Sequence, residues 1–437
     1  MKASLRKQAA LITCANALTR GMGFCLHLLL ARLMSAEALG VMEMAGSVSM
    51  LALTPVTAGI PTAMSRMTAQ RPGVDRENVL RAGLHHVRRL SLVLSPVLVA
   101  LSPLLSWLLG DQRTLPAIAV NVPAMALLGA CGVYSGYCIG LGQARLPAAC
   151  ECAEQAVRLG LSVGLVALMG RLGCGDIAVT AALPGLAEVI AGAVVVGLFR
   201  RSLPLPRRRD RPSVALRRQL TRLSLPMMLS RLCATGTKAL EAVLLPLCLR
   251  RSGLSQAAAT AQFGLLNGMA LPLMLLPGIV TGALCTVTTP AVTRLEHRKA
   301  PLRRMMRQLY LSAALIGLGA TGAVGALAGF LGAVVYRQAA LVPLLRVMCP
   351  LALLLSVHQV QFGMVAGLGL QQRALPGTIL SSAVTLMMMA WLCPLPHLRI
   401  YGAALALMAG RATGLVWNGV LLARAVRREA PCDQPAP

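Results

Sequence analysis

Apolar segments about 20 residues long recur along the whole chain, and short polar segments separate them. A helix of that length and composition crosses the hydrocarbon core of a bilayer. The pattern therefore predicts roughly twelve membrane-spanning helices. Their expected ranges are 8–33, 39–64, 86–109, 115–141, 149–169, 177–199, 223–249, 257–289, 309–335, 341–368, 376–393 and 401–423.

The eighth of these ranges, 257–289, is longer than one span needs and contains Pro272 and Pro277. Proline removes a backbone donor and crowds the preceding turn, so we expect a kinked or broken helix there. The expected fold class is an all-α polytopic membrane protein.

Composition supports the membrane class. The 437 residues are 56% hydrophobic and only 13% charged, and the mean hydropathy is +0.70. Soluble domains carry about 25% charged residues. A net charge of +28 would suggest nucleic-acid binding in a soluble protein, but here no soluble domain surrounds the basic segments.

The positions of the basic residues predict the topology. With the N-terminus inside, 29 of the 42 Lys and Arg fall in cytoplasmic segments, seven fall outside and six lie within spans. Cytoplasmic loops of membrane proteins carry an excess of Lys and Arg. We therefore expect an even number of spans in the cytoplasmic membrane, with both termini in the cytoplasm.

An arginine-rich segment, 200–222, lies near the middle of the chain and contains nine arginines and three prolines. Its charge keeps it out of the bilayer, so we expect a cytoplasmic linker between two six-helix lobes. The expected parts are a lobe at 1–199, the linker at 200–222, a lobe at 223–423 and a tail at 424–437.

The two halves share short motifs at one offset. The sequence GLGQARLP at 140–147 matches GLGLQQRALP at 367–376, and Arg66 matches Arg294. The common offset, 227 to 229 residues, predicts two parallel six-helix repeats with the substrate site between halves. Gly136 with Gly140, and Gly325 with Gly329, are expected to be close helix-packing positions.

Sequence patterns of soluble active sites are missing. The chain has no Gly-x4-Gly-Lys-Ser/Thr loop, no His-Glu-x-x-His and no Gly-x-Ser-x-Gly, and its 13 cysteines include no Cys-x-x-Cys pair. We therefore expect neither an enzyme nor a cofactor or metal site.

Ionisable residues inside the spans are the candidate binding groups, because such residues are costly and usually face a polar cavity or a partner. In the first span Asn16, Arg20 and His27 share one helical face with Thr13. In the seventh span Arg231, Lys238 and Glu241 do the same, and the second span adds Glu43. These residues are expected to line a central cavity and bind substrate.

A structural alternative is that some of these charges only neutralise each other. The candidate pairs are Lys238 with Glu241 and His27 with Glu43. A further pair, Glu154 with Arg158, has the i,i+4 spacing of a helix-packing salt bridge.

Several motifs resemble the multidrug/oligosaccharidyl-lipid/polysaccharide flippase superfamily, in particular its stage V sporulation protein B group. They are TRGMGF at 19–24, LGV at 39–41, AGIPTAMSR at 58–66, GYCIGLGQ at 136–143, EQAVR at 154–158 and GMALPL at 268–273. The chain is similar at greater distance to lipid II flippases, which have an arginine and an aspartate where this chain has Leu26 and His27.

The resemblance implies two six-helix lobes that work by alternating access on a lipid-linked saccharide, in cell-wall or spore-cortex synthesis. Recognition through a pyrophosphate fits arginine's bidentate donors and a chain with 3% aromatic residues. The alternatives are a multidrug/cation antiporter of the same superfamily, and a non-transporting scaffold for cell-wall synthesis enzymes.

Overall fold

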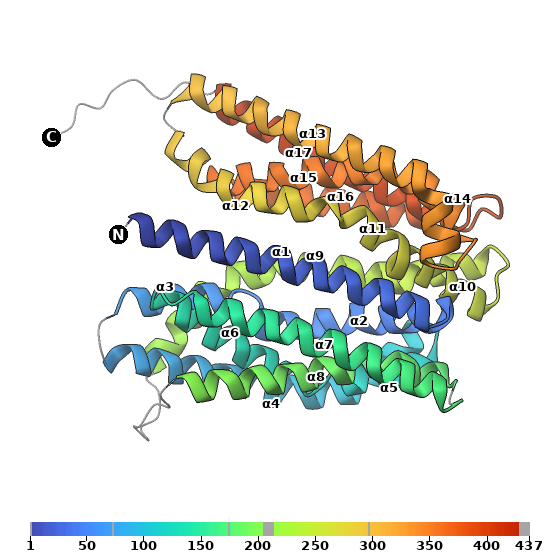
Figure 1. The fold of residues 1–437 in the computed structure, drawn as a ribbon, viewed down its shortest axis with the longest axis horizontal. Helices are drawn as coiled ribbons and strands as arrows, with labels where there is room; N and C mark the ends of the chain where they lie inside the picture. Colours follow the sequence, from blue (N-terminus) through green and yellow to red (C-terminus); the bar gives the residue numbers. More distant parts are fainter. Residues whose placement is uncertain (1, 72–73, 174, 204–213, 296–297, 428–437) are drawn as a thin grey trace. The chain divides into compact units, whose positions relative to one another are not determined.

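The computed structural model describes residues 2–71, 74–173, 175–203, 214–295 and 298–427. Every regular element in these ranges is a helix. Contacts divide the chain into two compact units (Figure 1). Unit 1 comprises Met1–Arg250 with Leu254–Gly268, and unit 2 comprises Arg251–Gly253 with Met269–Pro437.

Unit 1 contains the first ten α-helices and a short 3-10 helix, η1. Their bounds are α1 Lys2–Leu33, α2 Ala36–Thr57, α3 Ile60–Ala69, α4 Val74–Leu108, η1 Gln112–Thr114, α5 Leu115–Val120, α6 Ala124–Gly140, α7 Arg145–Arg171, α8 Ile177–Ser202, α9 Val214–Arg251 and α10 Gln256–Gly264. Helices α1 and α7 pack together, as do α7 with α8, α3 with α6 and α2 with α10.

Unit 2 contains the remaining helices. A π-helix, η2 (Leu265–Ala270), joins the two units, and α11 Leu271–Leu275, α12 Pro277–Leu295, α13 Lys299–Phe330, η3 Leu331–Val335, α14 Leu341–Met348, α15 Pro350–Gly367, α16 Gln371–Leu392 and α17 Ile400–Arg427 follow. Helix α15 is central in this unit because it contacts α12, α13 and α17.

Ten helices in the described residues are long and apolar enough to cross a membrane, or eleven when the bent pair Gln112–Val120 and Ala124–Gly140 is one span. Helix α1 covers the first predicted range, 8–33, but it is not one of these ten helices. Each of the twelve predicted ranges therefore coincides with one helix or with consecutive helices, and the prediction of a polytopic all-α fold is confirmed.

The predicted break in the eighth range is confirmed. This stretch contains α10, the π-helix η2, the five-residue α11 and α12, which begins at Pro277. A π-helix opens the regular hydrogen-bond ladder, and Pro277 lacks an amide donor. Helix α9 begins at Val214, so 214–222 of the expected linker is helical, while 204–213 lies outside the described residues.

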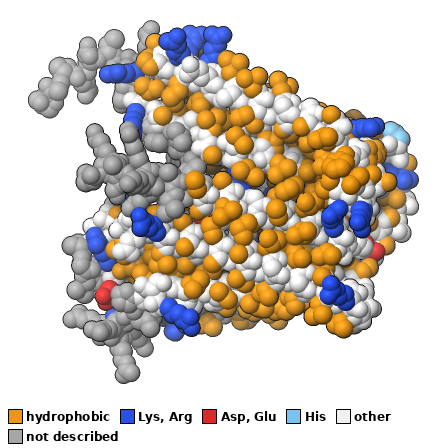
Figure 2. Space-filling model, in the orientation of Figure 1, with side chains coloured by type: hydrophobic (Ala, Val, Ile, Leu, Met, Phe, Trp, Pro, Cys, Tyr) orange, Lys and Arg blue, Asp and Glu red, His pale blue; other side chains and the backbone are white. Residues whose placement is uncertain are grey.

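Large apolar side chains cover the outer surfaces of the helices. Figure 2 shows hydrophobic side chains over the middle of the face drawn, with Lys and Arg gathered toward its ends. Trp107, Leu315 and Trp391 are 68%, 66% and 72% exposed. Surface of this kind is typical of contact with a membrane rather than with water.

Glycine pairs allow two helix contacts of the same kind, one in each unit. A Cβ on Gly136 or Gly140 would meet α3 at Pro61 or at Ser65. A Cβ on Gly363 or Gly367 would likewise meet α12 at Cys285 or at Thr289. The packing expected of Gly136 and Gly140 is confirmed. A Cβ on Gly329 would meet nothing within 4 Å, and one on Gly325 would meet only Cys349 Sγ at 3.6 Å, so the close packing expected of that pair was wrong.

A buried polar cluster in unit 1 is centred on Asp111, after the end of α4. Its carboxylate is 2% exposed and accepts Arg113 Nε at 2.9 Å, Arg113 Nη2 at 2.8 Å and Thr260 Oγ1 of α10 at 3.2 Å. Arg113 also contacts Glu37 of α2 at 2.6 Å. Burial raises the Asp111 pKa, but these hydrogen bonds from Arg113 and Thr260 outweigh it and hold the pKa below its ordinary value.

We expect Asp111→Asn to lower the free energy of unfolding by about 2 kcal/mol, because Arg113 loses its charge-assisted acceptor. A depressed folded-state pKa contributes stability above the unfolded pKa and loses it as the pH falls. Thermal unfolding of the purified protein should therefore show a difference between variant and wild type at pH 7 that shrinks below about pH 4.

The matched control is Asp176→Asn, since Asp176 is an exposed N-cap of α8 and asparagine caps equally well. If Asp111→Asn unfolds at the wild-type temperature at pH 7, the contact does not stabilise unit 1.

Candidate functional site

Unit 1 contains a cavity of about 810 Å³ lined by α1, α2, α5, α6, α7, α8 and α9. Helix α2 contributes a face of residues three or four apart, including Glu43, Met50 and Thr54. Helix α9 contributes Arg231, Thr235 and further residues at the same spacing. Residues so spaced lie on one side of a helix, so each helix turns one face to the cavity.

A buried hydrogen bond fixes α9 against α2. The hydroxyl oxygens of Thr54 and Thr235 lie 3.1 Å apart. Arg231 and Lys238 flank Thr235 at spacings of four and three, and both are exposed lining residues. The threonine contact therefore holds two cations of the seventh predicted span at the cavity wall.

His27 and Glu43 form the pair that the sequence offered as an alternative. His27 Nδ1 lies 3.4 Å from Glu43 Oε1, and no hydrogen bond joins these two atoms. Both members of the pair line the cavity, so pairing and a place in the site are compatible.

The predicted pairing of Arg158 with Glu154 was wrong. Arg158 Nη2 lies 3.3 Å from Glu188 Oε2, and Glu188 is on α8. The i,i+4 rule describes an isolated helix, whereas α7 packs closely on α8 and brings a carboxylate from the neighbouring helix within reach. Arg158 and Glu188 both line the cavity and are the site residues that sequence reasoning missed.

The lining has more positive than negative charge. Arg158, Arg231 and Lys238 are three fixed cations, and Glu43 and Glu188 are two carboxylates. The difference is one positive charge, and protonation of His27 would add a second. Each carboxylate lies beside a different basic group, so the site suits an anionic group better than a cationic one.

The other predicted site residues lie off this lining. Asn16 and Arg20 are on α1, where Asn16 is half-buried and Arg20 exposed, and Glu241 is half-buried on α9. Their substrate roles stay predictions. Within the described residues, no three His, Cys, Asp or Glu side chains are grouped to hold a metal ion.

This chain is similar in sequence and in fold to known proteins. Residues 5–296, about two thirds of the chain, match the family described as polysaccharide biosynthesis protein. Stage V sporulation protein B of Bacillus subtilis (strain 168) is 25% identical over 444 residues, which cover 98% of this chain and 85% of that protein.

Two solved transporters share the architecture. An inward-facing multidrug resistance MATE family transporter of the MOP superfamily superposes with a TM-score of 0.75 at 17% identity and covers 96% of each chain. The lipid II flippase MurJ, in an inward closed conformation, superposes with a TM-score of 0.74 at 11% identity, covering 95% of this chain and 87% of its own.

The sequence match covers well over half of the chain, and the helices have the arrangement of these transporters. The chain therefore belongs to the polysaccharide biosynthesis protein family, and its helices have the fold of these two transporters.

Proposed function

We propose that this protein is a membrane transporter, a flippase that moves a lipid-linked saccharide across the cytoplasmic membrane by alternating access. The observation that carries the proposal is the excess of cations in the unit 1 cavity. A pyrophosphate that links a saccharide to its lipid is anionic. In a low-dielectric cavity, Arg231 and Lys238 would offset the cost of bringing that charge into the membrane.

The proposed substrate-binding set keeps the seven predicted residues and adds two. His27, Glu43, Arg231 and Lys238 line the cavity, and Arg158 and Glu188 join them there. The proposed set also includes Asn16, Arg20 and Glu241, which lie off the cavity lining. Arginine offers a planar pair of donors that matches phosphate oxygens, and lysine acts as a point charge.

The physiological role follows by analogy with the relatives. One is named for stage V of sporulation and another for flipping lipid II. We therefore propose a precursor of peptidoglycan or another cell-surface polysaccharide as cargo, delivered to cell-wall synthesis enzymes, with the spore cortex as one setting.

A multidrug/cation antiporter is the second candidate, because Glu43 and Glu188 are carboxylates at the cavity wall. Such a transporter needs carboxylates that exchange an organic cation for protons or sodium. Here both carboxylates have basic neighbours at 3.4 and 3.3 Å. Those contacts favour an anionic cargo.

We expect Arg231→Gln and Lys238→Gln each to reduce transport of a lipid-linked pyrophosphate saccharide about tenfold or more, because each removes a charge-assisted contact with phosphate. The Arg20→Ala variant is also expected to lose transport of this saccharide. Flipping in proteoliposomes measures the rate, and the amount of folded protein is measured on the same samples.

Arg171→Gln is the matched control, since it makes the same charge change at the exposed end of α7, away from the cavity lining. The proposal fails if Arg231→Gln and Lys238→Gln flip at the control's rate. Uptake of an organic cation by the wild type, with no flipping, would support the antiporter instead.

The proposed orientation places both termini in the cytoplasm, on the 29 to 7 division of basic residues. A reporter active only in the cytoplasm should work when fused after Pro437 or at Ser213, and a reporter active only outside should work at Ser252. Activity of the outside-only reporter at Ser213 would contradict this topology.

A further inference from the structure

A second hollow, separate from the cavity of unit 1, lies within unit 2 and has a volume of about 1030 Å³. One face of α13 and one face of α17 form its walls, and both faces have spacings of three and four residues. We call it the α13–α17 groove, and it is lined by Ala300, Arg303, Arg304, Met306, Arg307, Tyr310, Gly419, Leu422, Ala423 and Val426.

Three exposed arginines, Arg303, Arg304 and Arg307, give this groove a strong positive charge. None of them pairs with a carboxylate among the described residues. The sequence explains why, since the acidic residues of 269–437 are Glu296, Glu429 and Asp433, all outside the described ranges. The described part of unit 2 therefore contains no carboxylate beside these arginines, and their charge favours an anionic ligand.

The groove also has an apolar floor and a neutral donor. Met306 and Leu422 are 7% and 1% exposed and pack in the core of unit 2. The Tyr310 hydroxyl accepts a hydrogen bond from Gln361 Nε2 at 3.1 Å, so its own proton can be donated to a ligand. A ligand seated here would meet cationic and hydroxyl donors on one side and apolar side chains on the other.

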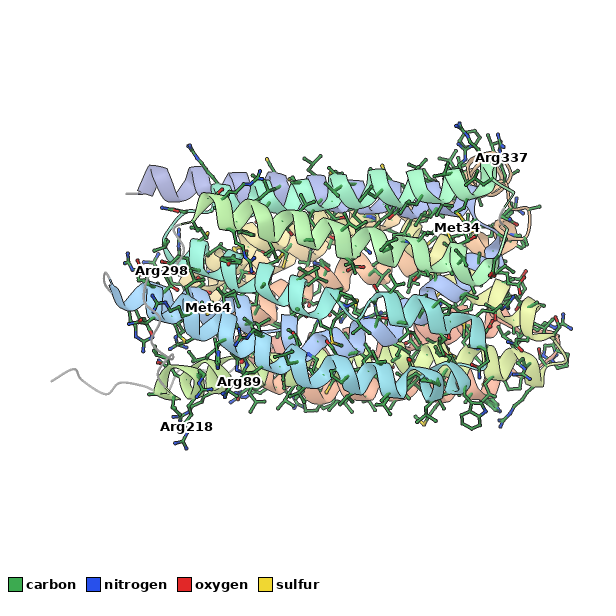
Figure 3. The ribbon with its side chains drawn as sticks, turned by 90° about the horizontal axis from the view of Figure 1, so that it is seen from below. Met34, Met64, Arg89, Arg218, Arg298 and Arg337 are labelled. Atoms are coloured by element: carbon green, nitrogen blue, oxygen red, sulfur yellow. The ribbon has the colours of Figure 1, made fainter. Side chains whose placement is uncertain are left out.

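The arginines lie at the expected edge of the bilayer. The 23 residues from 308 to the end of α13 rise about 35 Å at 1.5 Å per residue, enough to cross a hydrocarbon core of about 30 Å. Arg298 lies just before this helix and Arg337 beyond its other end (Figure 3). The groove is therefore at headgroup depth rather than within the hydrocarbon.

An apolar strip continues from Arg307 into the predicted hydrocarbon region. Leu311, Leu315 and Leu318 follow at spacings of four, four and three, and they are 52%, 66% and 54% exposed. These spacings keep the strip on one side of α13 with Arg307. An acyl chain attached to an anion bound at the arginines would lie along these leucines.

We propose that the α13–α17 groove binds the phosphate headgroup of an anionic membrane glycerophospholipid, with an acyl chain along the leucine strip of α13. Basic pockets between membrane helices at the headgroup level are suited to such lipids. The strip distinguishes a lipid from free phosphate, which has no apolar part. This site shares no lining residue with the cargo cavity of unit 1, and it does not depend on the proposed transport activity.

Lipid binding to the purified full-length protein tests the proposal, by native mass spectrometry with phosphatidylglycerol as the probe. The double variant Arg303→Gln/Arg307→Gln is expected to bind phosphatidylglycerol about thirtyfold more weakly than wild type, at about 1 kcal/mol for each cation. Arg337→Gln/Arg346→Gln removes the same charge from exposed residues elsewhere in unit 2 and should bind like wild type. Phosphatidylethanolamine should bind wild type more weakly, and inorganic phosphate should not displace the lipid.

Four results would overturn the proposal. The first is that the Arg303→Gln/Arg307→Gln variant binds phosphatidylglycerol with wild-type affinity. The second is that the Arg337→Gln/Arg346→Gln control loses as much affinity, which would mean that the lipid responds only to the protein's overall surface charge. Displacement by inorganic phosphate would indicate a phosphate site, and competition by a lipid-linked pyrophosphate saccharide would make the groove part of the cargo path. Thermal unfolding without added lipid confirms that the variants are folded.

Discussion

The cost of placing charge in a low-dielectric membrane governs this structure. An ionised side chain at the bilayer centre costs about 2.5–3.5 kcal/mol on insertion scales, so such a residue needs a partner, a cavity or a route to the interface. The chain has 42 basic residues and only 14 acidic ones, so pairing alone cannot satisfy them. Most basic residues lie near helix ends, and a small group on α7 and α9 lines the cavity of unit 1.

Helix packing holds those few charges in place. The Thr54–Thr235 hydrogen bond fixes α9 against α2, and Gly40 allows the close approach of α2 to Thr260 of α10. The buried Asp111 carboxylate joins α10 to the segment after α4, while Arg113 reaches α2. The cavity is thus built on helices that are braced by polar contacts and by close backbone packing.

Much of this organisation could be predicted from the sequence because the signals are local. Apolar runs mark the helices, Pro272 and Pro277 mark a break, and intramembrane charge marks His27, Glu43, Arg231 and Lys238. The sequence did not show which side chain of a neighbouring helix each charged residue would contact. Arg158 has Glu154 one turn away on its own helix, yet it contacts Glu188, because the packing of α7 on α8 decides the distance. Spacing along one helix cannot predict that.

The position of a bound cargo headgroup tests the central claim most directly. A cryo-electron microscopy structure of the protein with an undecaprenyl-type pyrophosphate saccharide would locate the two phosphorus atoms. The account predicts that they lie in the unit 1 cavity, with phosphate oxygens within salt-bridge distance of Arg231 and Lys238. A pyrophosphate bound away from both side chains, with the cavity empty, would contradict it.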